Sequence, residues 1–322
     1  QSGRSKADRG TPFDVVVTET PKEPNVLPAQ MPLQRPMMQL SLGAPAWDVP
    51  PDQWDWSRTG AGGKWRTALQ YGDGPANQPT EKGLYANAET YPGADPHHKE
   101  VDANGRPYVR LHTRKFPKPV AELDMSGKAT GKYLGFQASW LSAQNIDALC
   151  AETGLWEFEY VSPSRRYAWA AFWMMGVKDR TTVWPPEIDV FEHFNGVYGA
   201  WNSQIETSST LHYGDFGKGR AGAQGATINL PHLGQKGVDL TTQIHKHQCL
   251  VTKDFITIFF DGVEIVQFKH ILKPVKATDT KRFHPIINVA VAPADANDAY
   301  DQGSGDMLAY GFRYFPLSEV SV

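Results

Sequence analysis

Three acidic residues lie within six positions of one another in this chain: Glu187, Asp189 and Glu192. Apolar residues separate and flank them, which predicts a β-strand packed against a core on one side. Side chains alternate along a strand, so Glu187 and Asp189 share a face, whereas strict alternation turns Glu192 away. We therefore predict a one-residue β-bulge near Val190–Phe191 that returns Glu192 to the same face.

Grouped carboxyl groups of this kind suit the hydrolysis of glycosidic bonds. Hydrolysis with retention needs a nucleophilic carboxylate and a protonated carboxylic acid about 5–5.5 Å apart. Four effective strand residues place the Cα atoms of Glu187 and Glu192 about 13 Å apart, so both side chains must lean inward over a concave sheet. Asp189 lies between them, where its charge favours a protonated neighbour. The alternative is a solvated outer face, but Trp184 and Phe194 at its ends argue against an exposed edge.

The composition predicts a globular protein with a sizeable core and no general attraction for nucleic acid or an anionic membrane. The 322 residues include 32 basic and 35 acidic side chains, so there is no excess of positive charge to attract phosphates. No run of about 18 apolar residues exists to span a bilayer. The 10 Trp, 12 Tyr and 15 Phe residues could stack against sugars, although composition alone favours core packing.

Two regions are expected along the chain. Residues 1–46 carry many prolines and little periodicity, which predicts an extended arm or linker with one short strand over Met37–Leu42. Residues 47–322 contain short apolar runs separated by turn residues, which predicts a β-sandwich or jelly roll. Phe260-Asp261-Gly262-Val263 is typical of a hairpin turn, and Asn145–Cys150 suits a single helical turn. The expected strands are Tyr108–Thr113, Tyr133–Trp140, Leu155–Val161, Ala170–Met175, His247–Val251, Ile256–Phe260, Pro285–Val291 and Leu308–Phe315.

Cysteine and histidine residues give no sign of a metal centre needed for catalysis. Cys150 and Cys249 are too few for a disulfide scaffold, and the sequence leaves open whether they pair or stay as buried thiols. His97 and His98 are expected in a loop, and His245 and His247 have the spacing of one strand face. Both pairs lack a third ligand for zinc. No phosphate-binding loop or nucleotide motif is present.

Several segments resemble glycoside hydrolase family 16. Glu187-Ile188-Asp189-Val190-Phe191-Glu192 resembles the bulge-containing form of the family's catalytic signature. Trp169-Ala170-Ala171-Phe172-Trp173 resembles a strand in which the family usually has proline at the position of Ala170. The similarity covers Tyr85 to Phe315 in the family's order, through segments that also include Gly154–Glu159, Thr210–Gly214, Phe259–Gly262 and Ile287–Val291.

The resemblance implies a β-jelly roll of the concanavalin A type, made of two curved antiparallel sheets with a cleft across the concave one. It implies Glu187 as the nucleophile, Glu192 as the general acid/base and Asp189 as their helper. It places Trp169, Trp173, Trp184 and His212 near the subsites that flank the cut bond. Catalysis would need no cofactor, but a structural calcium is allowed, with Asp306 as the candidate ligand. The expected protein is a secreted monomer that acts on a polysaccharide; periplasm, cell surface and phage particle stay open as locations.

The substrate is less well defined by the sequence. Pro185-Pro186-Glu187, with no glycine before the glutamate, resembles members that cut bacterial exopolysaccharides, and a β-glucan is the related choice. The alternative is a marine galactan such as agar, porphyran or carrageenan. Loop charges at Arg165, Arg166, Lys218 and Arg220 would suit an anionic polymer, although solvated loop charges are the more ordinary interpretation. A non-catalytic, lectin-like protein on the same fold is the alternative from another class. A phage-tail depolymerase would differ in context only.

Overall fold

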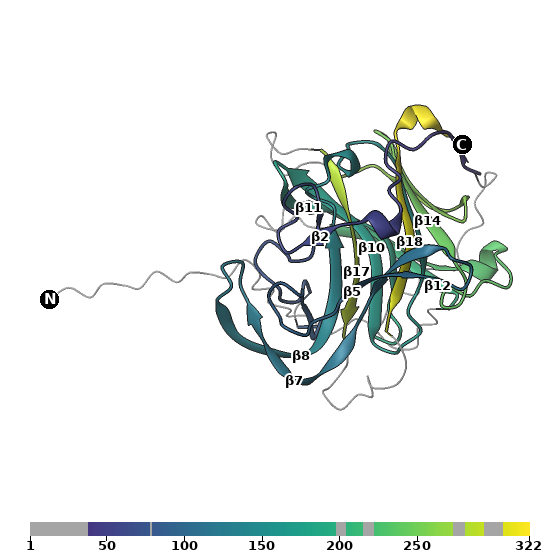
Figure 1. Cartoon of the computed structure of the whole chain (residues 1–322). Helices are drawn as coiled ribbons and strands as arrows, with labels where there is room; N and C mark the ends of the chain where they lie inside the picture. Colours follow the sequence, from purple (N-terminus) through teal and green to yellow (C-terminus); the bar gives the residue numbers. More distant parts are fainter. Residues whose placement is uncertain (1–37, 78, 198–203, 215–221, 273–280, 293–304) are drawn as a thin grey trace. The chain divides into compact units, whose positions relative to one another are not determined.

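The computed structural model describes residues 38–77, 79–197, 204–214, 222–272, 281–292 and 305–322 (Figure 1). Most of the expected arm, up to residue 37, lies outside the described residues. The compact unit begins at Met38, so residues 38–46 belong to it. Within them Ser41–Leu42 forms strand β1, and Gln39 makes an isolated bridge to Val263.

The strands form two large sheets and one small one, in agreement with the all-β fold expected. The first sheet has ten strands, and eight of them follow the order β13 (Gly222–Asn229), β12 (Glu206–Tyr213), β11 (Thr181–His193), β10 (Ala168–Lys178), β17 (Phe283–Val291), β8 (Ala129–Ser142), β3 (Trp65–Arg66) and β2 (Trp56–Ser57). The other two, β4 (Gly83–Tyr85) and β7 (Arg114–Leu123), both pair with β8. The long β7–β8 pair bends in an arc at one side of the sheet (Figure 1).

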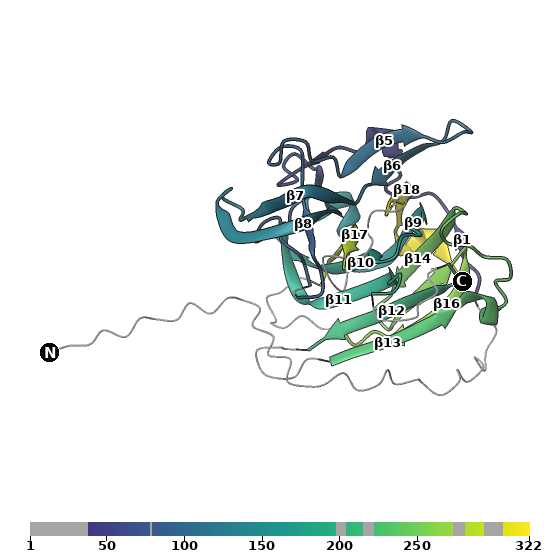
Figure 2. The ribbon, with the colours of Figure 1, turned by 90° about the horizontal axis from the view of Figure 1, so that it is seen from below.

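The second sheet has seven strands, in the order β16 (Val263–Lys269), β15 (Phe255–Phe260), β14 (His245–Val251), β9 (Gly154–Val161), β18 (Met307–Phe315), β6 (Pro107–Leu111) and β5 (His97–Val101). Figure 2 shows strands of this sheet, such as β14 and β16, lying behind β11, β12 and β13 of the first. Strands β1 and β19 (Val320–Ser321) form a small separate pair. The described helices are short 3₁₀ turns at Pro51–Gln53, Asp147–Leu149, Leu230–Leu233 and Leu317–Glu319.

The main core lies between the two large sheets. Alternation along β10 turns Phe172 and Met174 into this core, where they meet Trp156 and Phe158 of β9. Rings of Phe158 and Phe172 pack edge to face, with centroids 5.8 Å apart. Full burial of such side chains contributes about 1.5–3 kcal/mol each, so this layer holds the sheets together.

A second apolar cluster covers the opposite face of the ten-stranded sheet. It includes Trp169 of β10, Trp140 of β8 and Ile286 of β17, with Trp173 and Met175 packed against it. Every second residue of β10 therefore points away from the main core. This outward face is the one on which the acidic residues of β11 lie, because Glu187 pairs with Met175 and Asp189 with Trp173.

The described elements agree with most of the sequence-based expectations. Each expected strand overlaps an observed one, the turn at Asp261–Gly262 joins β15 to β16, and the helical turn appears at Asp147–Leu149. His97 and His98 were expected in a loop, but they begin strand β5. Cys150 and Cys249 are both buried and unpaired, which answers the question that the sequence left open. Among the described residues, no helix has the length and apolar character required to span a bilayer.

Candidate active site

The predicted bulge in β11 is present and brings three carboxyl groups to one face. Phe172 of β10 pairs with Phe191 and the next residue, Trp173, with Asp189, so Val190 is the extra residue on β11. On the other side, β12 shows the same shift between Asp189 and Glu192. The side chains of Val190 and Phe191 are both fully buried in the main core. The bulge thus absorbs one apolar residue and lets Glu192 follow Glu187 and Asp189 onto the outward face.

His212 joins the first two carboxyl groups from the neighbouring strand. It pairs directly with Glu187 across β11 and β12. Its Nε2 atom lies 3.1 Å from Asp189 Oδ2 and 3.6 Å from Glu187 Oε1. Burial lowers the pKa of His212, but the hydrogen bond to Asp189 and the two carboxylate charges outweigh this and raise it to about 9. His212 is therefore the cation of this cluster at neutral pH.

Glu187 and Asp189 are hydrogen-bonded to each other and share one environment. Burial and the charge of Asp189 raise the pKa of Glu187, against the opposing effect of His212. Burial and the charge of Glu192 raise the pKa of Asp189 to about 6, again against His212. Two carboxyl groups this close do not both ionise readily, so the pair retains a shared proton beyond the usual pH range of a carboxyl group.

Glu192 lies at the other end of the acidic row. Trp169 donates its indole N–H to Glu192 Oε1 over 3.2 Å. Burial and the charge of Glu187 raise the pKa of Glu192 to about 8, while the bond from Trp169 opposes the shift. Glu192 is consequently protonated at neutral pH, which is the state that a general acid requires.

Trp184 reaches the site because the hydrogen-bonded pairing of β11 with β10 is interrupted next to it. Regular pairing with β10 breaks between Glu187 and Val183, so the intervening Trp184-Pro185-Pro186 bulges out. Proline has no N–H to give to a ladder, which explains the break. The indole N–H of Trp184 donates to Glu187 Oε2. The Trp184 side chain is exposed, unlike the buried Trp169, so it is the better placed of the two to meet a ligand.

Trp173, the third tryptophan expected at the site, is held by residues that the sequence analysis did not single out. Its indole donates to Asn288 Oδ1 over 2.8 Å, and its ring packs edge-on against Trp140 at 5.4 Å. Asn288 in turn donates to the hydroxyl of Tyr85. The sequence does distinguish Asn288, because it is the single polar residue in the apolar run Pro285–Val291.

The acidic row also offers a donor set for a metal ion. Oxygen atoms of Glu187 and Asp189 and a nitrogen of His212 all lie within 4.8 Å of one another. The high pKa of His212 disfavours this use, since an imidazolium has no lone pair for a metal. The residues therefore fit acid–base chemistry better than metal binding.

Asp306, the candidate calcium ligand, lies away from this row, beside Arg110 and His112. Its carboxylate is 2.7 Å from His112 Nδ1 and 3.4 Å from Arg110 Nη1. The backbone N–H of Thr113 also donates to it. A guanidinium beside the carboxylate competes with a divalent cation, so the described surroundings do not fit a calcium site.

The loop charges expected near the cleft are described only in part. Arg166 lies with its guanidinium carbon 4.6 Å from the centre of the Tyr167 ring, a cation–π contact. Lys218 and Arg220 lie outside the described residues.

The fold places this chain among known structures. Its jelly roll is the fold of the family 16 glycoside hydrolases, in agreement with the resemblance seen in the sequence. A non-specific endo-β-1,3(4)-glucanase of that family aligns with a TM-score of 0.60 and 19% identity, over 87% of this chain and 98% of the other. An endo-1,3-β-glucanase (laminarinase) from Thermotoga petrophila aligns with a TM-score of 0.59 and 18% identity, over 87% and 99%.

A third similar structure comes from work on endo-acting O-glycanases that members of the human gut microbiota express to initiate mucin breakdown. It aligns with a TM-score of 0.60 and 18% identity, over 85% of this chain and 90% of the other. No protein-family model matches the sequence, and no curated protein matches it either. Structural similarity at this level of identity defines the fold, whereas the chemistry depends on the residues of the site.

Proposed function

We propose that this protein is an endo-acting glycoside hydrolase that cleaves internal β-linkages of a polysaccharide with retention, through a covalent glycosyl-enzyme intermediate. The observation that carries the proposal is the acidic row itself. Three carboxyl groups share one face of one strand, and one of them, Glu192, has its pKa raised to about 8. The fold shared with family 16 endo-glucanases supports the same chemistry.

In the first step, Glu187 attacks the anomeric carbon while Glu192 protonates the departing glycosidic oxygen. Glu187 must be ionised to attack, and its hydrogen bond to Asp189 provides a place for their shared proton. Cationic His212, 3.1 Å from Asp189, favours the ionised forms of both partners. The indole of Trp184 stabilises the carboxylate of Glu187 in the same way.

In the second step, the deprotonated Glu192 takes a proton from water, and that water attacks the glycosyl-enzyme. The pKa of Glu192 suits this alternation, because a group that titrates near pH 8 gives up and regains a proton readily. Trp169 fixes the orientation of the Glu192 carboxyl through its indole N–H. The sugar emerges with the configuration it had in the polymer, because two displacements have occurred.

The substrate that we propose is a bacterial exopolysaccharide or a β-glucan, and the location is extracellular, where such polymers occur. The similar structures include an endo-1,3-β-glucanase and an endo-β-1,3(4)-glucanase, which favours a β-glucan as the first substrate to test. Trp169, Trp173 and Trp184 surround the acidic row. The exposed Trp184 and the half-buried Trp173 would supply apolar surface for the C–H faces of sugar rings, and the buried Trp169 would line the site beneath them.

The test is to incubate the purified protein with laminarin, mixed-linkage β-glucan, agar, carrageenan and a set of bacterial exopolysaccharides, and to measure the size and early anomeric configuration of the products. We expect oligosaccharides of several sizes from one polymer, released first as the β-anomer. Glu192→Gln is the matched control, since it keeps the shape of the side chain and removes the acid. Initial release of the α-anomer would overturn the retaining mechanism, and equal activity of Glu192→Gln would overturn the assignment of the site.

A further inference from the structure

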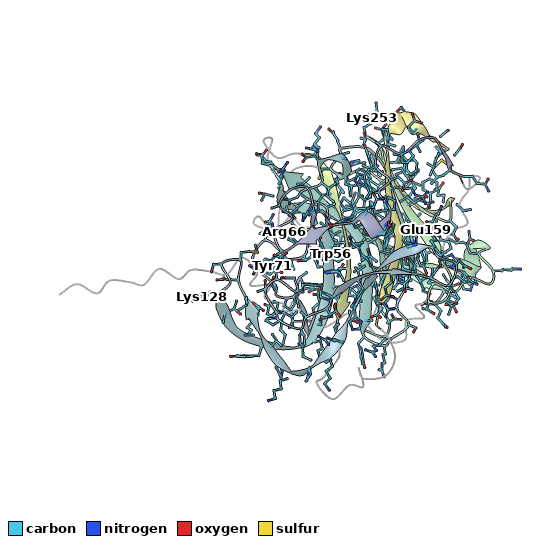
Figure 3. The ribbon with its side chains drawn as sticks, in the orientation of Figure 1. Trp56, Arg66, Tyr71, Lys128, Glu159 and Lys253 are labelled. Atoms are coloured by element: carbon cyan, nitrogen blue, oxygen red, sulfur yellow. The ribbon has the colours of Figure 1, made fainter. Side chains whose placement is uncertain are left out.

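A buried carboxyl group lies just before strand β4 and has no part in the acidic row. It belongs to Glu81, which is 6% exposed. The backbone N–H groups of Ala76 and Asn77 donate to its two oxygens over 3.0 and 3.1 Å. Next to them, the hydroxyl of Tyr71, which Figure 3 labels, donates to the carbonyl of Pro75. The carboxyl group is therefore held in place from the backbone side.

Three hydrogen bonds, the Glu81 chain, join this carboxyl group to Trp173. The hydroxyl of Tyr85 donates to Glu81 Oε2 over 2.9 Å. The amide nitrogen of Asn288 donates to the Tyr85 hydroxyl over 3.1 Å, and Asn288 Oδ1 accepts the indole N–H of Trp173 over 2.8 Å. Tyr85 and Asn288 are 0% and 5% exposed, so water does not compete strongly for these bonds.

The two ends of the Glu81 chain set the direction of every bond in it. The indole N–H of Trp173 can only donate, so the oxygen of the Asn288 amide faces it and the nitrogen faces Tyr85. At the other end, the carboxyl oxygens of Glu81 accept two backbone N–H groups and the hydroxyl of Tyr85. Reversal of any bond would leave a donor facing a donor or an acceptor facing an acceptor. The chain thus holds one orientation of the Asn288 amide.

Burial disfavours the charge of Glu81, and no cation compensates for it. No Lys, Arg or His pairs with Glu81 among the described residues, although a buried glutamate is almost always paired. Burial raises the pKa of Glu81 to about 7, against the opposing effect of its three hydrogen bonds. An apolar side chain would fill this position without that cost. The retained acid therefore indicates a use other than packing.

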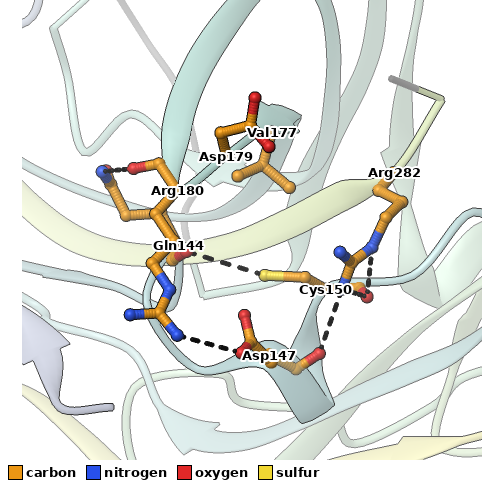
Figure 4. Close-up of a pocket in the computed structure, with 7 residues that line it drawn as sticks. All are labelled: Gln144, Asp147, Cys150, Val177, Asp179, Arg180 and Arg282. Carbon is orange, nitrogen blue, oxygen red and sulfur yellow. Dashed lines mark hydrogen bonds and ion pairs between the residues drawn. The ribbon is translucent and has the colours of Figure 1, made fainter. Parts of the chain in front are cut away.

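The polar contacts around the β10–β11 hairpin differ from the Glu81 chain. They border a cavity of about 210 Å³, where Gln144 donates to the carbonyl of Arg180 and Arg180 pairs with Asp147 (Figure 4). The side chains of Arg180 and Asp147 are 56% and 66% exposed, so this pair fixes a hairpin at the surface. The Glu81 chain lies within the protein and ends beside the acidic row.

Trp173 is the member of the Glu81 chain that a substrate can reach. It pairs directly with Asp189 across β10 and β11, so its ring leaves the sheet beside that carboxyl group. Its side chain is half-buried, and Trp140 packs edge-on against it at 5.4 Å. The contact with Trp140 and the bond to Asn288 act on different parts of the ring and together fix its tilt.

We propose that Glu81 is a positioning residue, which holds the Trp173 ring at one tilt against the sugar beside the cleaved bond, by way of Tyr85 and Asn288. The inference rests on the proposed hydrolysis, because it assigns Trp173 to substrate binding. Glu81 is buried and touches no substrate itself. Its effect falls on KM rather than kcat, because the chain ends on Trp173 and not on an acid of the row.

The first measurement needs no substrate and follows the indole N–H of Trp173 by NMR in the full chain. Its signal is identified by its loss in Trp173→Phe. Tyr85→Phe removes one hydroxyl and leaves the Asn288 amide free to turn, so the signal should shift and exchange faster with water. Tyr91→Phe is the matched control, because it removes another buried hydroxyl, one that bonds Leu123 and Asp73, and it should leave the signal in place.

Two variants test the far end of the chain by the same signal. Glu81→Ala removes the acceptor of the Tyr85 hydroxyl and should act like Tyr85→Phe. Glu81→Gln keeps an oxygen that can accept this bond and should restore most of the wild-type signal. Thermal unfolding of each variant shows whether it is folded, and Tyr85→Phe decides the matter if Glu81→Ala folds poorly.

The second measurement is kinetic and uses the polymer that the substrate panel identifies. Tyr85→Phe should raise KM about fivefold and leave kcat within about twofold, as expected for the loss of one hydrogen bond that acts on binding. Combined with Trp173→Phe, it should raise KM no further, because the chain acts only through that ring. Tyr91→Phe should change neither constant.

The outcomes separate this inference from the proposed hydrolysis. An unchanged Trp173 signal in Tyr85→Phe, an equal shift in Tyr91→Phe, or a KM effect of Tyr85→Phe that persists without Trp173 would overturn the positioning role. An active enzyme with an altered signal and an unchanged KM would also overturn that role alone. A wild-type protein that is inactive on every polymer would overturn the hydrolysis, and the positioning role with it.

Discussion

Two strands of this protein carry acidic residues at the same spacing, and their surroundings differ. On β9, Glu157 and Glu159 face the outside of the seven-stranded sheet, where Glu159 is labelled in Figure 3. Arg313 lies 2.8 Å from Glu157 and 3.2 Å from Glu159, and Arg106 lies 2.6 Å from Glu159. On β11, Glu187 and Asp189 have His212 as their cationic partner, and no Arg or Lys pairs with the acidic row among the described residues.

The difference shows that spacing alone does not define a catalytic site. Both strands place acids two residues apart on one face, as alternation requires. Where guanidinium groups neutralise the charges, the carboxylates serve as structural ion pairs. Where burial and mutual repulsion raise the pKa values, they are held ready to exchange protons.

The largest expected effect separates the two strands by activity. Glu187→Gln should lower kcat by about 10⁴-fold or more, because the nucleophile is lost while its shape remains. Glu157→Gln makes the same chemical change on β9 and should leave kcat within about twofold, since no reacting group is touched. Steady-state rates on the substrate found in the panel provide the measurement. Similar losses in both variants would erase the distinction between the strands.

Asp189→Asn tests whether the central acid acts through its neighbours. We expect kcat to fall about 10–100-fold, less than for Glu187→Gln, because Asn still accepts a bond but cannot take up the shared proton. The pKa of His212 should also fall below its value of about 9, since Asp189 is the main group that raises it. NMR titration of the His212 ring measures this, and an unchanged titration would contradict the assignment.

These contrasts also show how far sequence reasoning can go. The strand character of β11 and its bulge followed from alternation, because three acids can share a face only with one extra residue between Asp189 and Glu192. The strands of the sandwich followed from short apolar runs between turn residues. The strand position of His97 could not be predicted in this way. The sequence of β5 is His-His-Lys-Glu-Val, which resembles a polar loop and forms a strand only by pairing with β6.

The neighbours of the site were harder to foresee. Asn288 reaches Trp173 because β17 lies next to β10, an adjacency between segments more than a hundred residues apart. The partners of Asp306 are Arg110 and His112, again distant in sequence. Local patterns predict elements and faces, whereas contacts across sheets depend on a topology that periodicity does not contain.

The acids of β11 and β9 should also differ in their effect on stability. Glutamine substitutions on the two strands should change the free energy of unfolding in opposite directions. Glu192 binds a proton in the folded protein up to about pH 8 but in the unfolded chain only up to about pH 4.5, so its contribution to stability falls as pH rises between these values. Glu192→Gln should therefore raise the free energy of unfolding by about 1–3 kcal/mol at pH 8, with little effect at pH 4.

Glu157→Gln should instead lower the free energy of unfolding by about 1–2 kcal/mol, because it breaks a buried pairing with Arg313 and Gln248. Urea unfolding of both variants at pH 4 and pH 8 gives the comparison. Destabilisation of Glu192→Gln at pH 8 would mean that the acidic row holds the fold together, as the β9 pair does.

The smallest effect concerns the proton on Glu192. Activity should decline above about pH 8, because the acid must be protonated to assist departure of the leaving group. The indole N–H of Trp169 bonds the Glu192 carboxyl and favours its ionised form, so Trp169→Phe should raise the pKa of Glu192 further. Loss of one hydrogen bond to a charged group is worth about one pH unit, and the basic limb of the kcat profile should move up by that amount.

The direction of this shift distinguishes two roles for Trp169. If Trp169 only supplied apolar surface to a sugar, Trp169→Phe would change KM and leave the basic limb in place. A shift toward lower pH would contradict the contact seen with Glu192. Trp173→Phe is the matched control, since its indole bonds Asn288 rather than an acid, and it should alter KM alone. The two tryptophans lie on one strand and one face, so a difference between them would come from the hydrogen-bond partner of each indole.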